Sequence, residues 1–257
     1  MKTSVWMLVF CVIAFYSCQK VIEVELNPSS PKYVITGNIT DQPGPYEIKI
    51  TSSINFDQDN NFPAVSGAKV YITDQNASST DTLTEVAPGR YRTHVLKGVP
   101  RHTYKLLVIL GEEMFSSVST MPTPQALDSL YTKSASFGDG TDVVAIYNDP
   151  VGLGNFYRLE LTIQDSLSQE IYLHNDKINN GSSVNHVLNN DIDVKTGDTI
   201  TVKLQCIDAD VYDFYYTLDQ ALKQNSAVIS NPKTNILGGA MGYFCAQTIR
   251  TRSFVFR

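Results

Sequence analysis

Alternating apolar and polar residues dominate the chain after residue 32. In residues 68–73, Ala68, Val70 and Ile72 fall on one face, and the polar or amphipathic residues between them fall on the other. This period of two is typical of a strand with one buried face. Runs of the same kind, separated by Gly, Pro, Asn and Asp, occur at 33–39, 46–54, 89–95, 103–110 and 114–120. Short strands at this spacing predict an N-terminal β-sandwich over residues 33–122.

The alternation stops at residues 120–124, where two prolines lie two positions apart. Both prolines cannot continue a central strand, because proline has no N–H for the ladder. We therefore expect a domain boundary here. Alternation resumes at 157–164 and 200–206 and predicts a second β-rich domain over residues 123–257. Cys206 is expected to point inward with the apolar face of its strand.

One segment changes period from two to between three and four. From residue 211 to residue 222 the apolar positions follow helical steps, which predicts one amphipathic helix near residues 210–224. Asp210 stands where an N-cap belongs, and Asp213 suits the positive end of the helix dipole. With Asp208 these residues form an acidic cluster, which we assign to helix capping because no further metal ligands stand at a usable spacing.

The first residues predict an export signal that ends at a cysteine. A lone charge at Lys2 precedes an apolar run over residues 5–16, which is shorter than the roughly 20 residues of a membrane span. A small residue precedes Cys18, so residues 1–17 are expected to be a lipoprotein signal peptide and Cys18 the lipidated N-terminus. Lipid at Cys18 would hold the chain on a membrane through the polar, proline-bearing tether of residues 18–32. The alternative is a soluble secreted protein whose first cysteines are incidental.

The net charge limits the classes of partner, and the cysteine count suggests a disulfide. The formal charge is −6 at pH 7, and an acidic chain without a basic stripe argues against a nucleic-acid partner. Once Cys11 leaves with the signal and Cys18 takes the lipid, only Cys206 and Cys245 remain. Two cysteines outside the cytosol suggest one disulfide, and the alternative is two unpaired buried thiols.

Local motifs for catalysis or metal binding are missing from the sequence. The histidines are isolated from one another, with no nucleophile elbow and no phosphate-binding glycine loop nearby. They are His94, His102, His174 and His186. We therefore predict no catalytic residue, no metal and no cofactor. A Ser/His/Asp site built from distant segments has no local motif, so an enzyme remains an alternative.

Two polar stretches are candidate binding surfaces. The first is an inter-strand loop with carboxylate and amide side chains between two aromatic rings, and it comprises Phe56, Asp57, Asp59, Asn60, Asn61 and Phe62. It resembles part of a calcium loop but lacks the glycine turn and the distal Glu, which favours a solvated loop. The two rings either anchor a partner or tuck into the edge of the sandwich. The second stretch, asparagine-rich residues 179–193, is expected to be a surface loop or hairpin.

Short motifs follow one another in a fixed order along nearly the whole chain. They are Cys18 and residues 22–23, 33–39, 63–70, 89–91, 104–106, 119–122, 127–130, 157–158, 231–232, 235–236, 239 and 242–244. In this order they resemble the Bacteroidota lipoproteins that carry domain of unknown function 4249. The motif at 65–68 is similar to the strand opening of immunoglobulin-like and carboxypeptidase-regulatory-like modules, which agrees with the predicted sandwich.

The resemblance implies an outer-membrane lipoprotein, often encoded beside a TonB-dependent transporter that imports large nutrients. It brings no catalytic residues with it. Glu23 and Glu25 lie close behind Cys18, which in such lipoproteins favours the cell surface. We expect an accessory lipoprotein of a TonB-dependent uptake system that binds the transporter or its nutrient cargo. A surface enzyme acting on glycans or peptides and a structural or adhesive surface module are the alternatives.

Overall fold

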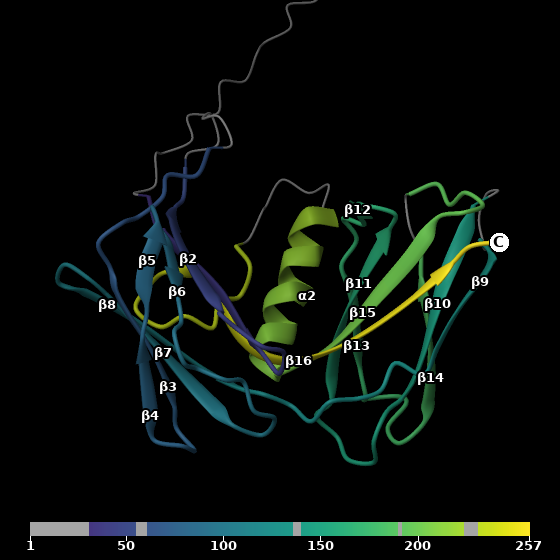
Figure 1. Cartoon of the computed structure of the whole chain (residues 1–257), viewed down its shortest axis with the longest axis horizontal. Coiled ribbons are helices and arrows are strands. Elements are labelled where there is room, and N and C mark those ends of the chain that lie inside the picture. Colours follow the sequence, from purple (N-terminus) through teal and green to yellow (C-terminus); the bar gives the residue numbers. More distant parts are fainter. Residues whose placement is uncertain (1–30, 55–60, 136–139, 190–191, 224–230) are drawn as a thin grey trace, which may run out of the picture. The chain divides into compact units, whose positions relative to one another are not determined.

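The computed structural model describes residues 31–54, 61–135, 140–189, 192–223 and 231–257. Residues 31–257 form one compact unit, which is built mainly from strands (Figure 1). In its described part there is one helix, α2 at Ala209–Lys223. The prediction of a mainly β fold with one amphipathic helix is therefore confirmed. Nowhere in the described ranges does a helix have the length and apolar character needed to cross a membrane.

The largest sheet has nine strands in the order β12-β11-β15-β16-β1-β2-β6-β5, with β13 also paired to β11. Its strands are β1 (Tyr33–Thr40), β2 (Glu47–Ser52), β5 (Thr84–Ala87), β6 (Arg90–Arg92), β11 (Phe156–Ile163), β12 (Ser166–Leu167), β13 (Tyr172–Asn175), β15 (Thr199–Ile207) and β16 (Met241–Val255). This one sheet collects strands from both ends of the described chain.

Two smaller sheets complete the fold. One has the order β4-β3-β7-β8 and the other the order β14-β10-β9. Their strands are β3 (Lys69–Asp74), β4 (Ser79–Thr82), β7 (Thr103–Leu110), β8 (Glu113–Thr120), β9 (Ser129–Ser134), β10 (Thr141–Asn148) and β14 (Ser183–Leu188). The runs predicted from alternation correspond to β1, β2, β3, β6, β7, β8, β11 and β15.

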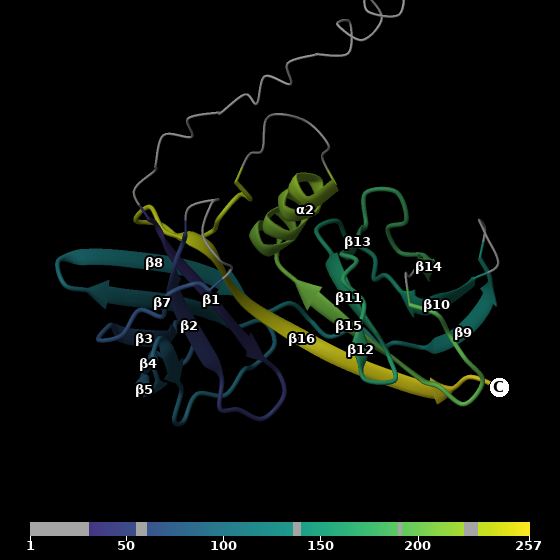
Figure 2. The ribbon, with the colours of Figure 1, turned by 90° about the horizontal axis from the view of Figure 1, so that it is seen from above.

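Strand β16 belongs to both halves of the chain. Its first part pairs in parallel with β1, from Val34 opposite Met241 to Thr40 opposite Gln247. Its second part pairs antiparallel with β15, beginning at Cys206 opposite Thr248. Figure 2 shows β16 running from the side of β1 to the side of β15. The domain boundary expected at residues 122 and 123 lies between β8 and β9. Strand β16 follows this boundary in the chain but pairs with β1, which precedes the boundary.

The nine-stranded sheet forms one layer of two sandwiches. The first core lies between this sheet and the β4-β3-β7-β8 sheet and includes Ile35, Ile48, Val70, Leu106 and Phe244. The second lies between the same sheet and the β14-β10-β9 sheet and includes Val143, Leu159, Leu161, Leu188 and Val202. A third cluster, with Ile207, Val211, Phe214, Tyr215 and Cys245, lies under α2. Because side chains alternate along β15 and β16, α2 covers the face opposite the two cores.

The suggested disulfide is absent, because Cys206 and Cys245 are both buried free thiols. The ladder places Cys206 opposite Thr248, and Cys245 lies three residues before Thr248 on β16. An odd offset puts Cys245 on the other face of the sheet. Accordingly, Cys206 packs in the second core and Cys245 packs under α2. The structure therefore holds the alternative, two unpaired buried thiols.

Helix α2 is capped by a different acid from the one predicted. The Oδ1 atom of Asp208 accepts the N–H of Val211 at 3.0 Å, which is the bond that an N-cap makes. Its Oδ2 atom accepts the hydroxyl of Ser119 on β8. Burial raises the pKa of the Asp208 carboxyl. Asp210 lies in the first turn, and Asp213 pairs with Lys233. The N-cap is therefore Asp208 and not Asp210, while the assignment of the acidic cluster to helix capping is confirmed.

The close approach of β16 to β1 depends on Gly242. This residue has a φ of 100°, and a Cβ placed on it would lie 2.1 Å from the carbonyl oxygen of Ile35. Gly239 has a similar φ of 92°, but a Cβ there would meet nothing within 4 Å. The two glycines thus share the same backbone requirement and differ in the space around them.

We expect Gly242→Ala to lower the free energy of unfolding by about 1–3 kcal/mol more than Gly239→Ala. Both substitutions place a side chain at positive φ, but only the first also forces β16 away from β1. Urea unfolding of the two variants measures the difference. Equal losses of unfolding free energy in the two variants would show that the close approach of Gly242 to β1 adds no cost beyond that of the positive φ.

Candidate functional site

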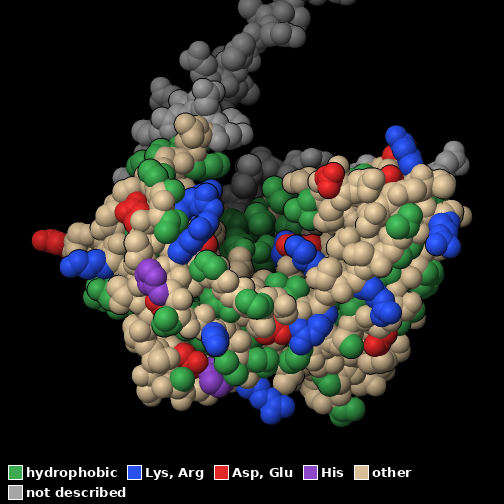
Figure 3. Space-filling view, viewed as in Figure 1, with side chains coloured by type: hydrophobic (Ala, Val, Ile, Leu, Met, Phe, Trp, Pro, Cys, Tyr) green, Lys and Arg blue, Asp and Glu red, His purple; other side chains and the backbone are tan. Residues whose placement is uncertain are grey.

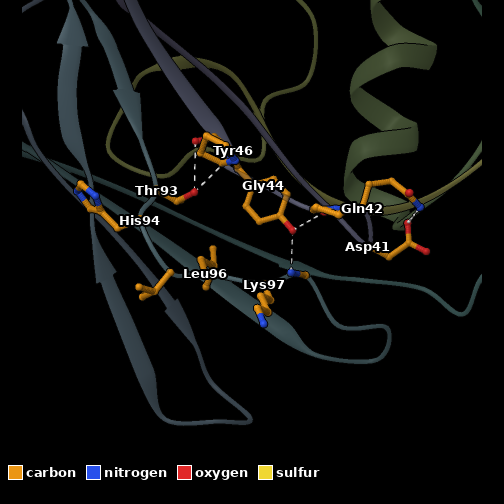
Figure 4. A pocket seen from close by; sticks show the side chains of 12 residues that line it. Asp41, Gln42, Gly44, Tyr46, Thr93, His94, Leu96 and Lys97 are labelled. Carbon is orange, nitrogen blue, oxygen red and sulfur yellow. Dashed lines mark hydrogen bonds between the residues drawn. The ribbon is translucent and has the colours of Figure 1, made fainter.

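A cavity of about 890 Å³ lies where β1 and β6 end and β2 begins. It is lined by residues 41–46, which connect β1 to β2, and by residues 93–98, which follow β6. We call it the loop cavity. Figure 4 shows its lining side chains, with Tyr46 between the two connecting segments. No local motif in the sequence pointed to these residues.

Tyr46 joins the two segments that line the loop cavity. Its hydroxyl accepts the N–H of Gly98 at 2.9 Å. The same hydroxyl lies 2.8 Å from the carbonyl oxygens of Thr40 and Gln42, to one of which it donates. Its backbone N–H donates to Oγ1 of Thr93 at 2.8 Å. These hydrogen bonds connect the two segments that line the loop cavity and fix the shape of the cavity (Figure 4).

The backbone of residues 94–96 is held by a buried carboxylate on β4. The Oδ2 atom of Asp81 accepts the N–H groups of His94, Val95 and Leu96 at 2.9, 2.8 and 2.8 Å. The Asp81 side chain is buried, so these amides satisfy a charge that would otherwise be costly to bury. The loop cavity is therefore preformed, which lowers the ordering cost of binding.

The exposed surface of the loop cavity is mainly apolar, with one unpaired cation. Val95 is 77% exposed, and Pro43 and Pro45 line the same space. The one acid of the lining, Asp41, pairs with Arg250 at 2.6 Å. The exposed Lys97 forms no ion pair within the part of the chain that the structure describes. A ligand with an apolar body and an anionic group fits this arrangement.

The first candidate binding loop falls mostly outside the described residues. Phe56, Asp57, Asp59 and Asn60 lie in the range 55–60, which the structure does not describe. Asn61 is exposed, and Phe62 is 51% exposed, so the Phe62 ring does not tuck fully into the sandwich. The segment follows the end of β2, whereas the loop cavity lies where β2 begins. The two described residues of the candidate loop, Asn61 and Phe62, do not line the loop cavity.

The asparagine-rich stretch is divided between a loop and a strand. Residues 183–188 form β14, which pairs with β10, and residues 190–191 lie outside the described ranges. The preceding strand, β13, pairs with β11 in the nine-stranded sheet. The connection 176–182 therefore crosses between two sheets and does not close a hairpin.

Hydrogen bonds join the connection 176–182 to residues 149–155, which link β10 to β11. We call these segments the paired loops. The Oδ2 atom of Asp149 accepts the N–H of Gly181 at 3.1 Å, and Asn180 Oδ1 accepts the N–H of Gly152 at 2.8 Å. Likewise, Asp176 Oδ2 accepts the N–H of Asn155 at 2.9 Å. Buried carboxylates thus hold this pair of loops as they hold the loop cavity.

Acidic and basic side chains are interspersed on the face shown in Figure 3, with no continuous basic stripe. Several ion pairs lie on the nine-stranded sheet. Arg90 and Arg92 both pair with Glu47, and Arg158 pairs with Glu160 at 2.6 Å. In the described ranges, no three His, Cys, Asp or Glu side chains are grouped so that they could hold a metal ion.

The four histidines do not form one site. His94 lines the loop cavity, and His102 pairs with Asp74 at 2.8 Å. His174 and His186 lie together at the second core, with 5.8 Å between their ring centroids. Burial and, as the smaller cause, the neighbouring His174 together lower the pKa of His186 to about 4. Burial also lowers the pKa of His174.

Comparison with known families gives a match over most of the chain. The model of a family described as Domain of unknown function (DUF4249) matches residues 19–253. No curated protein matches the sequence. The matched range covers both sandwiches, the loop cavity and the paired loops, and it assigns a role to none of their residues.

We expect the His174 and His186 pair to make the protein less stable as the pH falls from about 6.5 to about 4. In this window an unfolded imidazole takes up a proton while folded His186 stays neutral, so protonation favours the unfolded state. The variant His186→Gln should lose part of this pH dependence. His94→Gln, which alters an exposed imidazole, should keep it. Urea midpoints at several pH values compare the three proteins, and parallel curves for His186→Gln and the native chain would contradict this account.

Proposed function

The chain belongs to the family of domain of unknown function 4249, and on this premise we propose that it is an accessory lipoprotein of a TonB-dependent nutrient uptake system. It is anchored in the outer membrane through lipid on Cys18 and faces the cell surface. It acts by non-covalent binding of the transporter or its cargo. The observation that carries the binding role is the preformed loop cavity, with its apolar lining and its unpaired Lys97.

The anchor is supported by the sequence. Lys2, the apolar run 5–16 and Cys18 lie in the range 1–30, outside the described residues. The first described strand begins at Tyr33. A tether of residues 18–32 would reach at most about 50 Å when fully extended. That length allows the loop cavity to meet a partner in the same membrane.

The construction of the loop cavity supports binding over hydrolysis of a glycan. Glycoside hydrolysis needs two carboxyl groups on either side of the bond that breaks. In the lining of this cavity the one carboxylate is Asp41, which pairs with Arg250 and accepts the N–H of Ile249 at 2.9 Å. Its oxygens are therefore engaged in holding the framework. The one lysine of the lining, Lys97, suits recognition of an anion.

The anchor can be tested by replacing the cysteine. In Cys18→Ala we expect the protein to leave the membrane fraction and to lose incorporation of a radiolabelled fatty acid, because the acylated thiol is gone. Asn27→Ala, within the tether, should leave both unchanged. A Cys18→Ala protein that stays with the membrane without label would show that another feature holds it there.

The binding role can be tested by co-purification. The native chain is tagged at its C-terminus, extracted gently from the outer membrane and examined for a protein recovered in equal amount. We expect a TonB-dependent barrel with the native chain, and about tenfold less of it with Val95→Asp combined with Lys97→Glu. Lys105→Glu repeats the charge reversal of Lys97→Glu at an exposed residue outside the cavity and should leave recovery of the barrel unchanged. Recovery of the native chain alone under several mild detergents would reject the transporter partner, and full recovery by the cavity variant would reject this cavity as its contact.

A further inference from the structure

The paired loops hold the most exposed apolar side chains of the described structure. Val151 is 90% exposed, Leu153 75% and Ile178 93%. No other large apolar side chain in the described ranges is as exposed as those of Val151 and Ile178. Single exposed apolar residues are common, but several on adjoining loops indicate a surface that meets an apolar partner.

The paired loops adjoin each other at Val151 and Gly181. A Cβ placed on Gly181 would lie 2.9 Å from Cγ2 of Val151. The bonds from Asp149, Asn180 and Asp176 described above hold both backbones in place. The exposed aliphatic side chains are therefore carried on loop backbones that are held in place.

The charges of the paired loops favour an anionic, apolar surface as the partner. All residues of both loops are described, and their two acids, Asp149 and Asp176, are buried. Lys177 is exposed and is the one basic residue of the two loops. An outward surface with aliphatic side chains, a lysine and no exposed carboxylate is suited to a bilayer, where a carboxylate near anionic headgroups would be repelled.

Tyrosines lie behind the apolar residues. Tyr212 of α2 and Ile178 line the same small cavity of about 230 Å³. Tyr216 is half-exposed and stacks on Tyr212, with 6.2 Å between ring centroids and 11° between planes. Tyrosine rings are enriched at the membrane–water interface because one end is apolar and the other polar. The combination of aliphatic, basic and aromatic side chains thus matches an interfacial membrane contact.

We propose that Val151, Leu153 and Ile178 enter the hydrocarbon boundary of a lipid bilayer, with Lys177 at the anionic headgroups. This contact would be separate from the lipid on Cys18. It rests on the proposed function in that the anchor is what keeps the chain at a bilayer. Two contacts fix the orientation of an anchored protein, whereas a tether alone leaves it free to rotate.

A tryptophan at the paired loops tests the contact. The one tryptophan of the chain is Trp6, which leaves with the predicted signal, so Ile178→Trp gives the mature chain one emitting indole. The lipidated protein is placed on vesicles of phosphatidylethanolamine and phosphatidylglycerol. We expect emission to shift to shorter wavelength and to lose most of its intensity when the acyl chains carry bromine. Val95→Trp, at an exposed residue of the loop cavity, is the matched control and should show neither effect.

A second preparation keeps this test independent of the acylated cysteine. The mature chain is held on vesicles by an N-terminal histidine tag and a nickel-chelating lipid in place of the acyl chains. Quenching of Ile178→Trp in this preparation, and its loss when Val151→Asp and Leu153→Asp are added, support the proposal even if the lipidated chain fails to float with vesicles. Protein that floats with an unquenched indole overturns the proposal and leaves the anchor intact. An emission change that needs the co-purified barrel and not lipid also overturns it, because the loops would then meet a protein.

Discussion

The structure depends on the point where β16 exchanges one partner strand for another. Up to Gln247 the strand pairs with β1, and from Thr248 it pairs with β15. At such an exchange the backbone groups of the strand lose their ladder partners, and a buried unpaired N–H or C=O is costly. Asp41, directly after β1, supplies the missing partners. Its N–H donates to the carbonyl oxygen of Gln247 at 3.3 Å, its Oδ1 atom accepts the N–H of Ile249 at 2.9 Å, and its Oδ2 atom pairs with Arg250. One side chain thereby allows a single strand to complete two sandwiches.

This exchange also connects the loop cavity to the framework. Residues 41–46 form one wall of the cavity, and their first member is the residue that fastens β16. The other wall is fastened separately, by Asp81 to three backbone N–H groups and by Tyr46 to Gly98. Both walls are therefore held by bonds to buried or half-buried groups. A cavity built in this way keeps its shape whether or not it is occupied, which suits recognition without rearrangement.

The sequence predicts those elements whose pattern follows from burial of a single face. Alternation gives β7 at its observed bounds, residues 103–110, and helical steps give α2. Strand β16 has no such pattern, because residues 244–248 are buried on both faces, by the cores on one side and by α2 on the other. The predicted disulfide is wrong for a related reason. The register of β15 on β16 decides on which face of the sheet each cysteine lies, and no local sequence pattern encodes this register. The loop cavity and the paired loops are held by Asp81 and Asp149, whose carboxylates accept hydrogen bonds from backbone N–H groups more than ten residues away. Bonds between a side chain and distant backbone leave no periodic signal, so the loop cavity could not be predicted from the sequence, and of the paired loops only residues 179–182 fell within a predicted binding surface.

The net charge of the chain does not describe the surfaces that meet partners. The chain is acidic, with a formal charge of −6, yet Asp81, Asp149 and Asp176 are buried and hold loop backbones in place. The charges left outward at the loop cavity and at the paired loops are those of Lys97 and Lys177. Because exposed groups set the local field while buried, hydrogen-bonded carboxylates are satisfied within the fold, both surfaces can receive anionic groups. An acidic net charge is therefore compatible with anionic partners at these two places, because Asp81, Asp149 and Asp176 contribute to the negative charge but are buried and shape the two surfaces from within.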